Sequence, residues 1–393
     1  MKIAPILLGS LLFLLVVALL PLPLSPYLDF QVIYHADLGL LRGIPIYDHT
    51  GQVNMIAGLA NVPPDQVYVL PFPYPPWYAL ATVWLAVFPV GFGVRLWFGL
   101  NLLALFASIW LMTDGWAAYK RLISFLPPFL FLPVLGTLFV GQYVFPVLLG
   151  AALWLYAAET EKPILIALAF ALLTFKPHLG ALILLAGLVY LGLRRDEFGR
   201  RSLVYTLVIA IVLSALGFLA DPAWPVNYFH SLVAFGQIPG VSSCNLCASF
   251  PAAIVQLVNW RAGFALAPIL APVILVALSI WWGLTRREVV HFPAPLLTLS
   301  VFMALLANPY LLNYDFVLLL LPFFVLMKQH RTRPGYLYLA LAYLLPVIAF
   351  IFLERAEHAA FFLSTFMLLA MLHRDARQLD VSQAPAYNPT TMK

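Results

Sequence analysis

The sequence predicts an all-α integral membrane protein that crosses the bilayer many times. Of its 393 residues, 63% are hydrophobic and only 9% are charged, whereas a soluble domain carries about a quarter charged residues. Apolar runs of bilayer length, or slightly less, recur along the whole chain between short polar turns. Composition and recurrence together indicate a polytopic bundle of about 12–13 transmembrane or re-entrant helices with a long first extracytoplasmic loop.

The apolar runs give the expected helices in chain order. They cover approximately residues 5–25, 75–94, 96–113, 122–140, 143–158, 163–176, 178–193, 202–220, 264–284, 293–308, 314–327, 335–353 and 359–372. Several are shorter than the roughly 20 residues that a straight span needs, so we expect some to be tilted, broken or re-entrant. The run at 122–140 holds three prolines and a glycine, and it is the one that we expect not to span.

Basic residues indicate the orientation. The loops rich in arginine and lysine are 194–201, 285–291 and 328–333. The alternating loops, poor in basic residues, are 221–262, 308–315 and 354–358. Because lysine and arginine are enriched in cytoplasmic loops, we expect the first set inside and the second set outside. Loop 26–74, with four aspartates and one arginine, is then expected outside. Both termini are expected inside, which requires an even number of spans, so one of the thirteen runs cannot span.

We therefore expect one transmembrane domain over residues 1–372 and a polar cytoplasmic tail over residues 373–393. Its two long outside loops are 26–74 and 221–262. The net charge of +5 could suggest binding of nucleic acid, but the basic residues lie in short loops between spans. That distribution is a topology signal of membrane proteins, so no nucleic-acid partner is expected.

Polar residues from distant parts of the chain gather on the outer membrane face. The first loop contributes Asp29, Asp37 and Asp48, the stretch "TFKPHLG" contributes Lys176 and His178, and the stretch "NPYLLNYD" contributes Tyr310, Tyr314 and Asp315. Cations beside carboxylates suit a reaction of an anionic substrate with a hydroxyl that must lose its proton. The sequence thus places a candidate active site on this face.

Lys176 has two interpretations. It stands between the apolar stretches "ALLTF" and "LGALILL", so its ammonium either reaches the interface or meets a buried anion. Pro177 favours the second, because a proline breaks the helix and frees backbone groups near the cation. His178 is either an interfacial histidine or a contact to a phosphate.

The loop aspartates also have alternatives, since each could simply keep the loop in water. Asp48, in "IYDHTG", is better explained as a turn or helix-capping residue. If residues 29–40 form an interfacial helix, Asp29 and Asp37 lie about 80° apart around it. A carboxylate at that partly desolvated depth can act as a general base, and Asp29 is our candidate.

Five stretches carry a resemblance to a known family. In chain order they are "DFQVIYHADLGLLRGIPIYD", "FPYPPWYALATVWLAVFPV", "GQYVFPVLLGAAL", "FALLTFKPHLGALILLAGL" and "ANPYLLNYDFVLLLLP". This order, over about residues 28–322, is similar to that of the family-87 glycosyltransferases, which are polytopic GT-C enzymes related to polyprenyl-phosphate-mannose-dependent mannosyltransferases. The resemblance implies a GT-C-like bundle in the plasma or inner membrane. It also implies inverting transfer of mannose or another hexose from a polyprenyl-phosphate donor to an extracytoplasmic glycan or glycolipid.

The resemblance also implies roles for individual residues. The family's catalytic aspartate, which opens the first outside loop, matches Asp29. The family motif K-P-x-x-G matches Lys176, Pro177 and Gly180, and P-Y-x-x-x-Y-D matches Pro309, Tyr310, Tyr314 and Asp315. Many members carry a histidine near the last motif, where this chain has Asn313 and Tyr314. The expected substrate-binding residues are Asp37, Tyr74, Lys176, His178, Tyr310, Tyr314 and Asp315, and no metal ligand or cofactor is expected.

Two other classes of protein remain as alternatives. A lipid or sugar transporter or flippase usually shows internal repeats and ionisable residues in the middle of its spans, and neither is evident here. A non-catalytic membrane scaffold would not require Lys176 beside a broken helix. Cys244-x-x-Cys247, in the second outside loop, has too few ligands for a zinc site and is either a local disulfide or a pair of free thiols.

Overall fold

A computed structural model confirms the all-helical fold class. It describes residues 3–20, 28–238, 247, 273, 293–308, 310–329, 333–352, 361 and 363–371. The helices in chain order are α1 (Ile3–Leu19), α2 (Leu28–Leu41), α3 (His49–Ala60), η1 (Pro64–Gln66), α4 (Pro76–Thr82), η2 (Val83–Val87), α5 (Val90–Met112), α6 (Ala118–Ile123), η3 (Pro127–Leu130), α7 (Leu132–Val140), α8 (Val144–Glu159), α9 (Pro163–Leu173), α10 (Pro177–Leu193), α11 (Glu197–Ala220), α12 (Trp224–Gln237), α16 (Ala294–Ala307), η5 (Asn313–Leu319), α17 (Leu320–Gln329) and α18 (Arg333–Phe352).

Two of the described helices, α5 and α11, are long and apolar enough to cross a membrane. Most other expected runs form apolar helices of 10–17 residues, such as α8, α9, α10 and α16. The pair Ala118–Leu130 and Leu132–Val140 passes the same criteria together but is bent by 70°. This bend falls in the proline-containing run 122–140, where the sequence predicts a broken segment. The expected run 264–284 lies outside the described residues except for Val273.

The break between the second and third expected runs lies earlier than predicted. The sequence suggests a boundary near residue 95, but η2 ends at Val87 and α5 begins at Val90. Pro89 is the N-cap of α5 in an extended conformation, with φ of −54° and ψ of 144°. Because proline lacks an N–H and its ring fixes φ, it favours a helix start and not a helix interior. Hydrophobicity continues across it, so hydropathy alone places the boundary wrongly.

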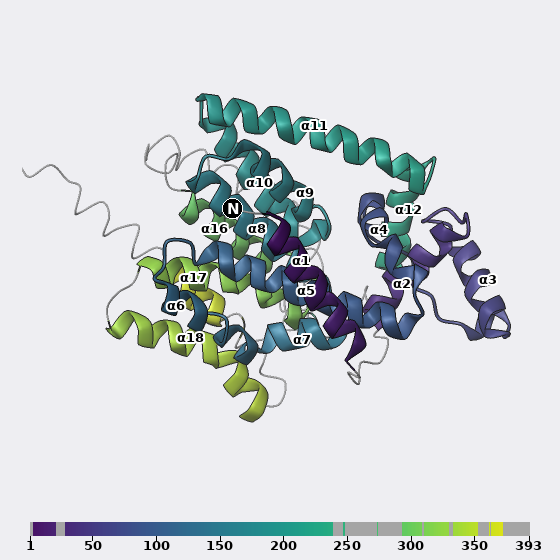
Figure 1. Cartoon of the computed structure of the whole chain (residues 1–393), viewed down its shortest axis with the longest axis horizontal. Coiled ribbons are helices and arrows are strands. Elements are labelled where there is room, and N and C mark those ends of the chain that lie inside the picture. Colours follow the sequence, from purple (N-terminus) through teal and green to yellow (C-terminus); the bar gives the residue numbers. More distant parts are fainter. Residues whose placement is uncertain are drawn as a thin grey trace, which may run out of the picture.

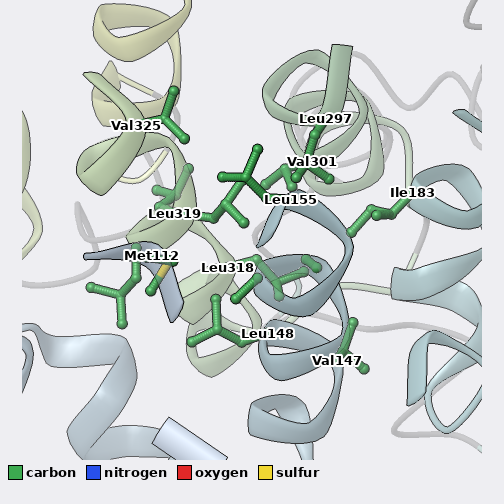
Figure 2. Close-up of a cluster of buried hydrophobic side chains, with 14 of the residues drawn as sticks. Met112, Val147, Leu148, Leu155, Ile183, Leu297, Val301, Leu318, Leu319 and Val325 are labelled. Atoms are coloured by element: carbon green, nitrogen blue, oxygen red, sulfur yellow. The ribbon is translucent and has the colours of Figure 1, made fainter. Parts of the chain in front are cut away.

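The centre of the bundle is α8, which packs between α5, α9 and the segment formed by η5 and α17. Figure 2 shows Leu148 and Leu155 near the side chains of Leu318 and Leu319. Small residues allow the backbones to approach closely on the α9 side: a Cβ at Gly150 would lie 2.9 Å from the carbonyl oxygen of Ala169. In a membrane, such close van der Waals packing is what holds helices together.

The helices fall into two groups along the long axis of the molecule. Figure 1 shows α2, α3, α4 and α12 at one end and α6, α17 and α18 at the other. The helices α5 and α8 run between the groups, and α11 runs along one side of the bundle. This arrangement places the first loop, with its aspartates, against the ends of the central helices.

The first loop is held in place by two hydrogen bonds to distant segments and one within the loop itself. The Ile46 N–H donates to Ala220 O at 3.2 Å, and the Tyr47 hydroxyl donates to Tyr74 O at 2.7 Å. The Ser231 hydroxyl donates to Phe72 O at 2.7 Å. The loop is therefore a packed part of the fold, and it fixes the position of α2.

Asp48 caps α3, as the sequence predicts. Its carboxylate accepts a hydrogen bond from the Gly51 N–H at 2.9 Å, which satisfies one of the free donors of the first helical turn. Asp29 lies in the first turn of α2, and the helix that the sequence analysis considers for residues 29–40 is present as α2 at Leu28–Leu41.

The helix break at Lys176 depends on a glycine. Lys176 has an extended backbone, with φ of −127° and ψ of 81°, and Pro177 starts α10. One turn later, a Cβ at Gly180 would lie 1.9 Å from the carbonyl oxygen of Leu173, the last residue of α9. Only glycine permits this approach, so Gly180 sets the angle at which α9 meets α10 and thereby the position of Lys176.

We expect Gly180→Ala to destabilise the protein by about 1–3 kcal/mol, because the new methyl group forces two helix ends apart. Gly192, in the same helix α10, has no atom within 4 Å of its virtual Cβ. Gly192→Ala is therefore the matched control, and it should be neutral or stabilising by up to about 1 kcal/mol. Thermal unfolding of the purified variants in detergent measures both effects, and equal shifts would contradict the packing argument.

Candidate active site

A buried ion pair forms the centre of the site. Lys176 Nζ lies 2.5 Å from Asp315 Oδ1, and the two side chains are 3% and 0% exposed. The other carboxylate oxygen, Asp315 Oδ2, accepts the Leu312 N–H at 3.0 Å. Lys176 thus meets a buried anion, and it does not extend to the interface. Aromatic rings surround its ammonium, with the ring centres of Tyr314 and Tyr143 at 5.0 and 5.3 Å.

Gln142 links this pair to its surroundings. Its Oε1 accepts a hydrogen bond from Lys176 Nζ at 3.1 Å, and its Nε2 donates to the Tyr314 hydroxyl at 3.0 Å. The preceding residue, Gly141, has a positive φ of 71°, which ends α7 and turns the chain toward the site. Trp97 Nε1 donates to the Gly141 carbonyl at 2.7 Å and fixes that turn.

Asp29 lies beside this network in the first turn of α2, and its side chain is half-buried. Burial raises the pKa of Asp29 above its ordinary value of 3.8. A hydrogen bond with the Gln142 side chain and the charge of Lys176 oppose that rise, while the charge of Asp315 adds to it. The three charged groups come from three distant segments, so the fold brings together Asp29, Lys176 and Asp315 as the sequence analysis anticipates.

Tyrosines form the wall between the first loop and the ion pair. Tyr74 is buried, and its ring packs edge-on against Tyr143 with ring centres 4.5 Å apart. Tyr78 joins them, at 5.8 Å from Tyr74 and 5.2 Å from Tyr143. Tyr314 is fixed by two hydrogen bonds. Its side-chain hydroxyl accepts one from the Gln142 amide, and its backbone carbonyl accepts one from the Thr137 hydroxyl at 3.1 Å.

His178 and Tyr310 form the accessible edge of the site. His178 is exposed and Tyr310 is half-buried, and their rings are 6.2 Å apart. Asn308 joins the two segments, because its Nδ2 donates to His178 O at 3.1 Å and its Oδ1 accepts the Tyr310 N–H at 3.0 Å. The site therefore has an accessible layer of Asp29, His178 and Tyr310 above a buried layer of Lys176, Asp315, Gln142 and Tyr314.

Asp37 is placed apart from this network. It lies two turns after Asp29 in α2, about 12 Å farther along the helix axis. It is 0% exposed, and its Oδ1 accepts the Thr82 hydroxyl at 3.2 Å. Its Oδ2 has no hydrogen-bond partner among the described residues. Burial raises the pKa of Asp37 well above 3.8, against the smaller opposite effect of the Thr82 hydrogen bond.

In loop 221–262, the structure describes residues 221–238, which include α12, and Cys247. Cys247 is buried and disulfide-bonded, and it packs against Tyr310 and Leu312. Cys244, the other cysteine of the chain, lies outside the described residues. Of the two sequence interpretations, the local disulfide is thus the supported one. Within the described ranges, no group of three or more histidine, cysteine, aspartate and glutamate side chains could hold a metal ion.

Gln142 contacts both Lys176 and Tyr314, and the sequence analysis does not single it out. It stands in the stretch "GQYVFP", where an amide follows a glycine between two apolar runs. A neutral polar residue at the end of a span is common, so its position alone carries little information. The signal that could identify it is the glycine before it, which allows a turn with positive φ at the membrane boundary.

Comparison with known families identifies a match over the middle of the chain. The model of "Glycosyltransferase family 87" matches residues 72–309, more than half of the chain. The matched range contains Tyr74, Gln142, Lys176 and His178, while Asp29 precedes it and Asp315 follows it. A search of curated proteins finds no match to this sequence.

Proposed function

Because the chain belongs to glycosyltransferase family 87, we propose that it transfers a hexose such as mannose from a polyprenyl-phosphate donor to a glycan or glycolipid. The protein is a glycosyltransferase and an integral membrane protein, and the transporter and scaffold alternatives lose their support. The proposal concerns the donor, the acceptor, the membrane face and the residue roles. We place the reaction on the extracytoplasmic side, where the positive-inside rule locates loop 26–74.

The observation that carries the mechanism is the position of Asp29 beside Lys176, Gln142 and Asp315. We assign Asp29 as the general base that takes the proton of the acceptor hydroxyl. The hydroxyl oxygen bonds to C1 of the sugar as the bond from C1 to the phosphate oxygen breaks, and the electron pair leaves with the lipid phosphate. One displacement inverts the anomeric centre, so a second carboxylate nucleophile is not required.

His178 is the better placed of the two predicted donor contacts. Its exposed ring lies beside Tyr310 at the accessible edge, within reach of a phosphate that approaches from solvent or lipid. Lys176 is already paired with Asp315 and is 2% exposed, so we place it in the buried layer below the donor phosphate. A charge in such a low-dielectric site still influences groups several ångströms away. We therefore assign Lys176 the role of holding Asp29 and Gln142 in position while it contributes positive charge near the leaving phosphate.

The test is transfer by the purified protein in lipid nanodiscs. We expect label to pass to glycan or glycolipid acceptors from polyprenyl-phosphate mannose or glucose and not from the matching nucleotide sugars. Use of nucleotide sugars alone would reject the proposed donor class. For the membrane face, a cysteine at the exposed position Asn54 should react with a membrane-impermeant thiol reagent in intact cells. A cysteine at Arg200, in an expected cytoplasmic loop, is the control and should react only in broken cells.

A further inference from the structure

A pocket lies among α6, α17 and α18, outside the candidate active site. It has a volume of about 820 Å³ and is formed by α6, η3, α17, α18 and the turn that precedes α6. Its walls are mostly apolar and include the rings of Trp116, Phe324 and Tyr343. The Trp116 and Phe324 rings are 6.0 Å apart, and the Tyr343 hydroxyl donates to the carbonyl of Pro127. This volume is within the range of about 300–1,000 Å³ that ligand pockets have.

The pocket lies at the opposite end of the central helices from the Lys176–Asp315 pair. The helix α8 begins at Val144, next to the site, and ends at Glu159, whose Oε2 is 3.5 Å from the pocket residue Lys328. Its 16 residues correspond to about 24 Å. Figure 1 shows the same separation, with α6, α17 and α18 at one end and α2 and α4 at the other. The pocket is thus a different site, near the other membrane face.

Apolar side chains surround the pocket on the outside of the molecule. Between residues 118 and 130, Leu122, Leu126 and Leu130 are each about two thirds exposed, and in α18 Leu337 and Leu341 are half exposed or more. In an integral membrane protein, such side chains contact the hydrocarbon of the bilayer. A ligand would therefore reach this pocket through the membrane and not from water.

The charges at the pocket are positive. Its lining includes Lys120 and Lys328 and no acidic residue. Lys120 has no ion pair among the described residues, and the pair of Lys328 with Glu159 is exposed and long at 3.5 Å, so it contributes little. Trp116 and Tyr336 lie in the same lining, and such aromatic residues favour the depth of lipid headgroups. Cations at headgroup depth above an apolar pocket match an amphiphile with an anionic head.

We propose that this pocket binds an anionic phospholipid of the membrane. The acyl chains occupy the space between α6, α17 and α18, and the headgroup phosphate contacts Lys120 and Lys328. The leaflet is the one opposite to the candidate active site. This inference depends on the membrane location of the protein and not on the sugar donor or on the mechanism proposed above.

The test uses the full-length protein in detergent, titrated with phospholipids whose acyl chains carry bromine. Bromine quenches nearby tryptophans, and the difference between wild type and Trp116→Phe isolates the signal of Trp116. We expect phosphatidylglycerol to quench this signal at an about 5- to 30-fold lower concentration than phosphatidylcholine, since each lysine near a headgroup contributes about fivefold. Equal quenching by both lipids would overturn the proposal.

Two variants and a control sharpen the result. Lys120→Gln with Lys328→Gln should abolish the preference for phosphatidylglycerol. The control, Lys162→Gln with Arg201→Gln, removes the same charge from exposed positions outside the pocket and should keep the preference. If the control variant loses the preference for phosphatidylglycerol equally, the preference arises from general surface charge and not from the pocket. Ala340→Phe, which fills the pocket, should weaken quenching by both lipids, and unchanged quenching there would assign the signal to bulk lipid and reject the site.

Discussion

Asp29→Asn will leave a folded, membrane-inserted protein that binds its lipid-phosphate donor but transfers sugar about 100- to 10,000-fold more slowly. Asparagine keeps the shape of the side chain and removes only the carboxylate that can accept a proton. The Gln142 amide beside it can still hydrogen-bond to the new side chain, so the local packing should survive. Initial rates with saturating donor and acceptor measure the loss, and binding of a labelled donor measures what is retained.

The pH dependence gives Asp29 a second readout. A base must be deprotonated to act, so kcat/KM should fall as the pH drops through the pKa of Asp29. Because burial raises that pKa above 3.8, the acid limb should lie at a higher pH than that of an ordinary carboxyl group. The limb should be absent from the residual activity of Asp29→Asn.

Two other aspartates of the first loop serve as comparisons. Asp48→Asn should retain turnover, because asparagine caps a helix about as well as aspartate. Asp37→Asn should have an intermediate effect at most, since Asp37 is buried away from the network. If Asp37→Asn is inactive while Asp29→Asn turns over normally, the base lies two helical turns farther on and the family motif is misaligned. If all three variants keep full activity, the carboxylate-base mechanism fails.

Lys176→Ala is expected to destabilise the protein by about 3–5 kcal/mol, because it leaves Asp315 charged and buried without its partner. Asp315 is 0% exposed, so water cannot replace the lost ammonium. Many proteins are stable by only about 5–15 kcal/mol, so a large loss of folded material should follow. The yield of monodisperse protein and the thermal midpoint in detergent measure the effect.

The double variant Lys176→Met with Asp315→Leu separates stability from function. Replacing both members of a buried ion pair by apolar residues of similar size is often neutral or stabilising. We therefore expect the double variant to recover the stability that Lys176→Ala loses. It should nevertheless transfer sugar poorly, because Asp29 and Gln142 lose the cation beside them. Turnover like that of the wild type would restrict the pair to a structural role.

The sequence predicts the elements of this fold better than it predicts their contacts. Hydropathy locates α8, α9, α10 and α16 because the bilayer demands long apolar runs. It misses the start of α5, because Pro89 ends one helix and starts the next without interrupting hydrophobicity. It marks the bend before α7 correctly, since prolines at 127, 128 and 133 cannot all continue one helix.

For the site, the sequence identifies the ionisable residues but not how they pair. Lys176 in an apolar stretch requires an anion or an interface, yet nothing local shows that the anion is Asp315, which is 139 residues away. Helical spacing alone puts Asp29 and Asp37 on nearly the same face of one helix and does not show which of them lies at the site. Their depths differ because Asp37 packs beneath α4, where Thr82 donates to it. Gln142 is found only through its contacts, since a neutral amide at the end of a span has many uses.

The helix α11 connects the thickness of the bilayer with the depth of the first loop. Its apolar part, residues 202–220, is about 28 Å long, close to the roughly 30 Å hydrocarbon core of a typical membrane. Arginines precede this part, and its large side chains face outward, including Leu207, Ile211 and Leu219. The last residue, Ala220, accepts the hydrogen bond from Ile46 of the first loop. In a thinner bilayer, hydrophobic mismatch would tilt this helix and move the loop that carries Asp29 to a different depth. If Asp29 is the base, we expect turnover to depend on the lipid composition of the host membrane.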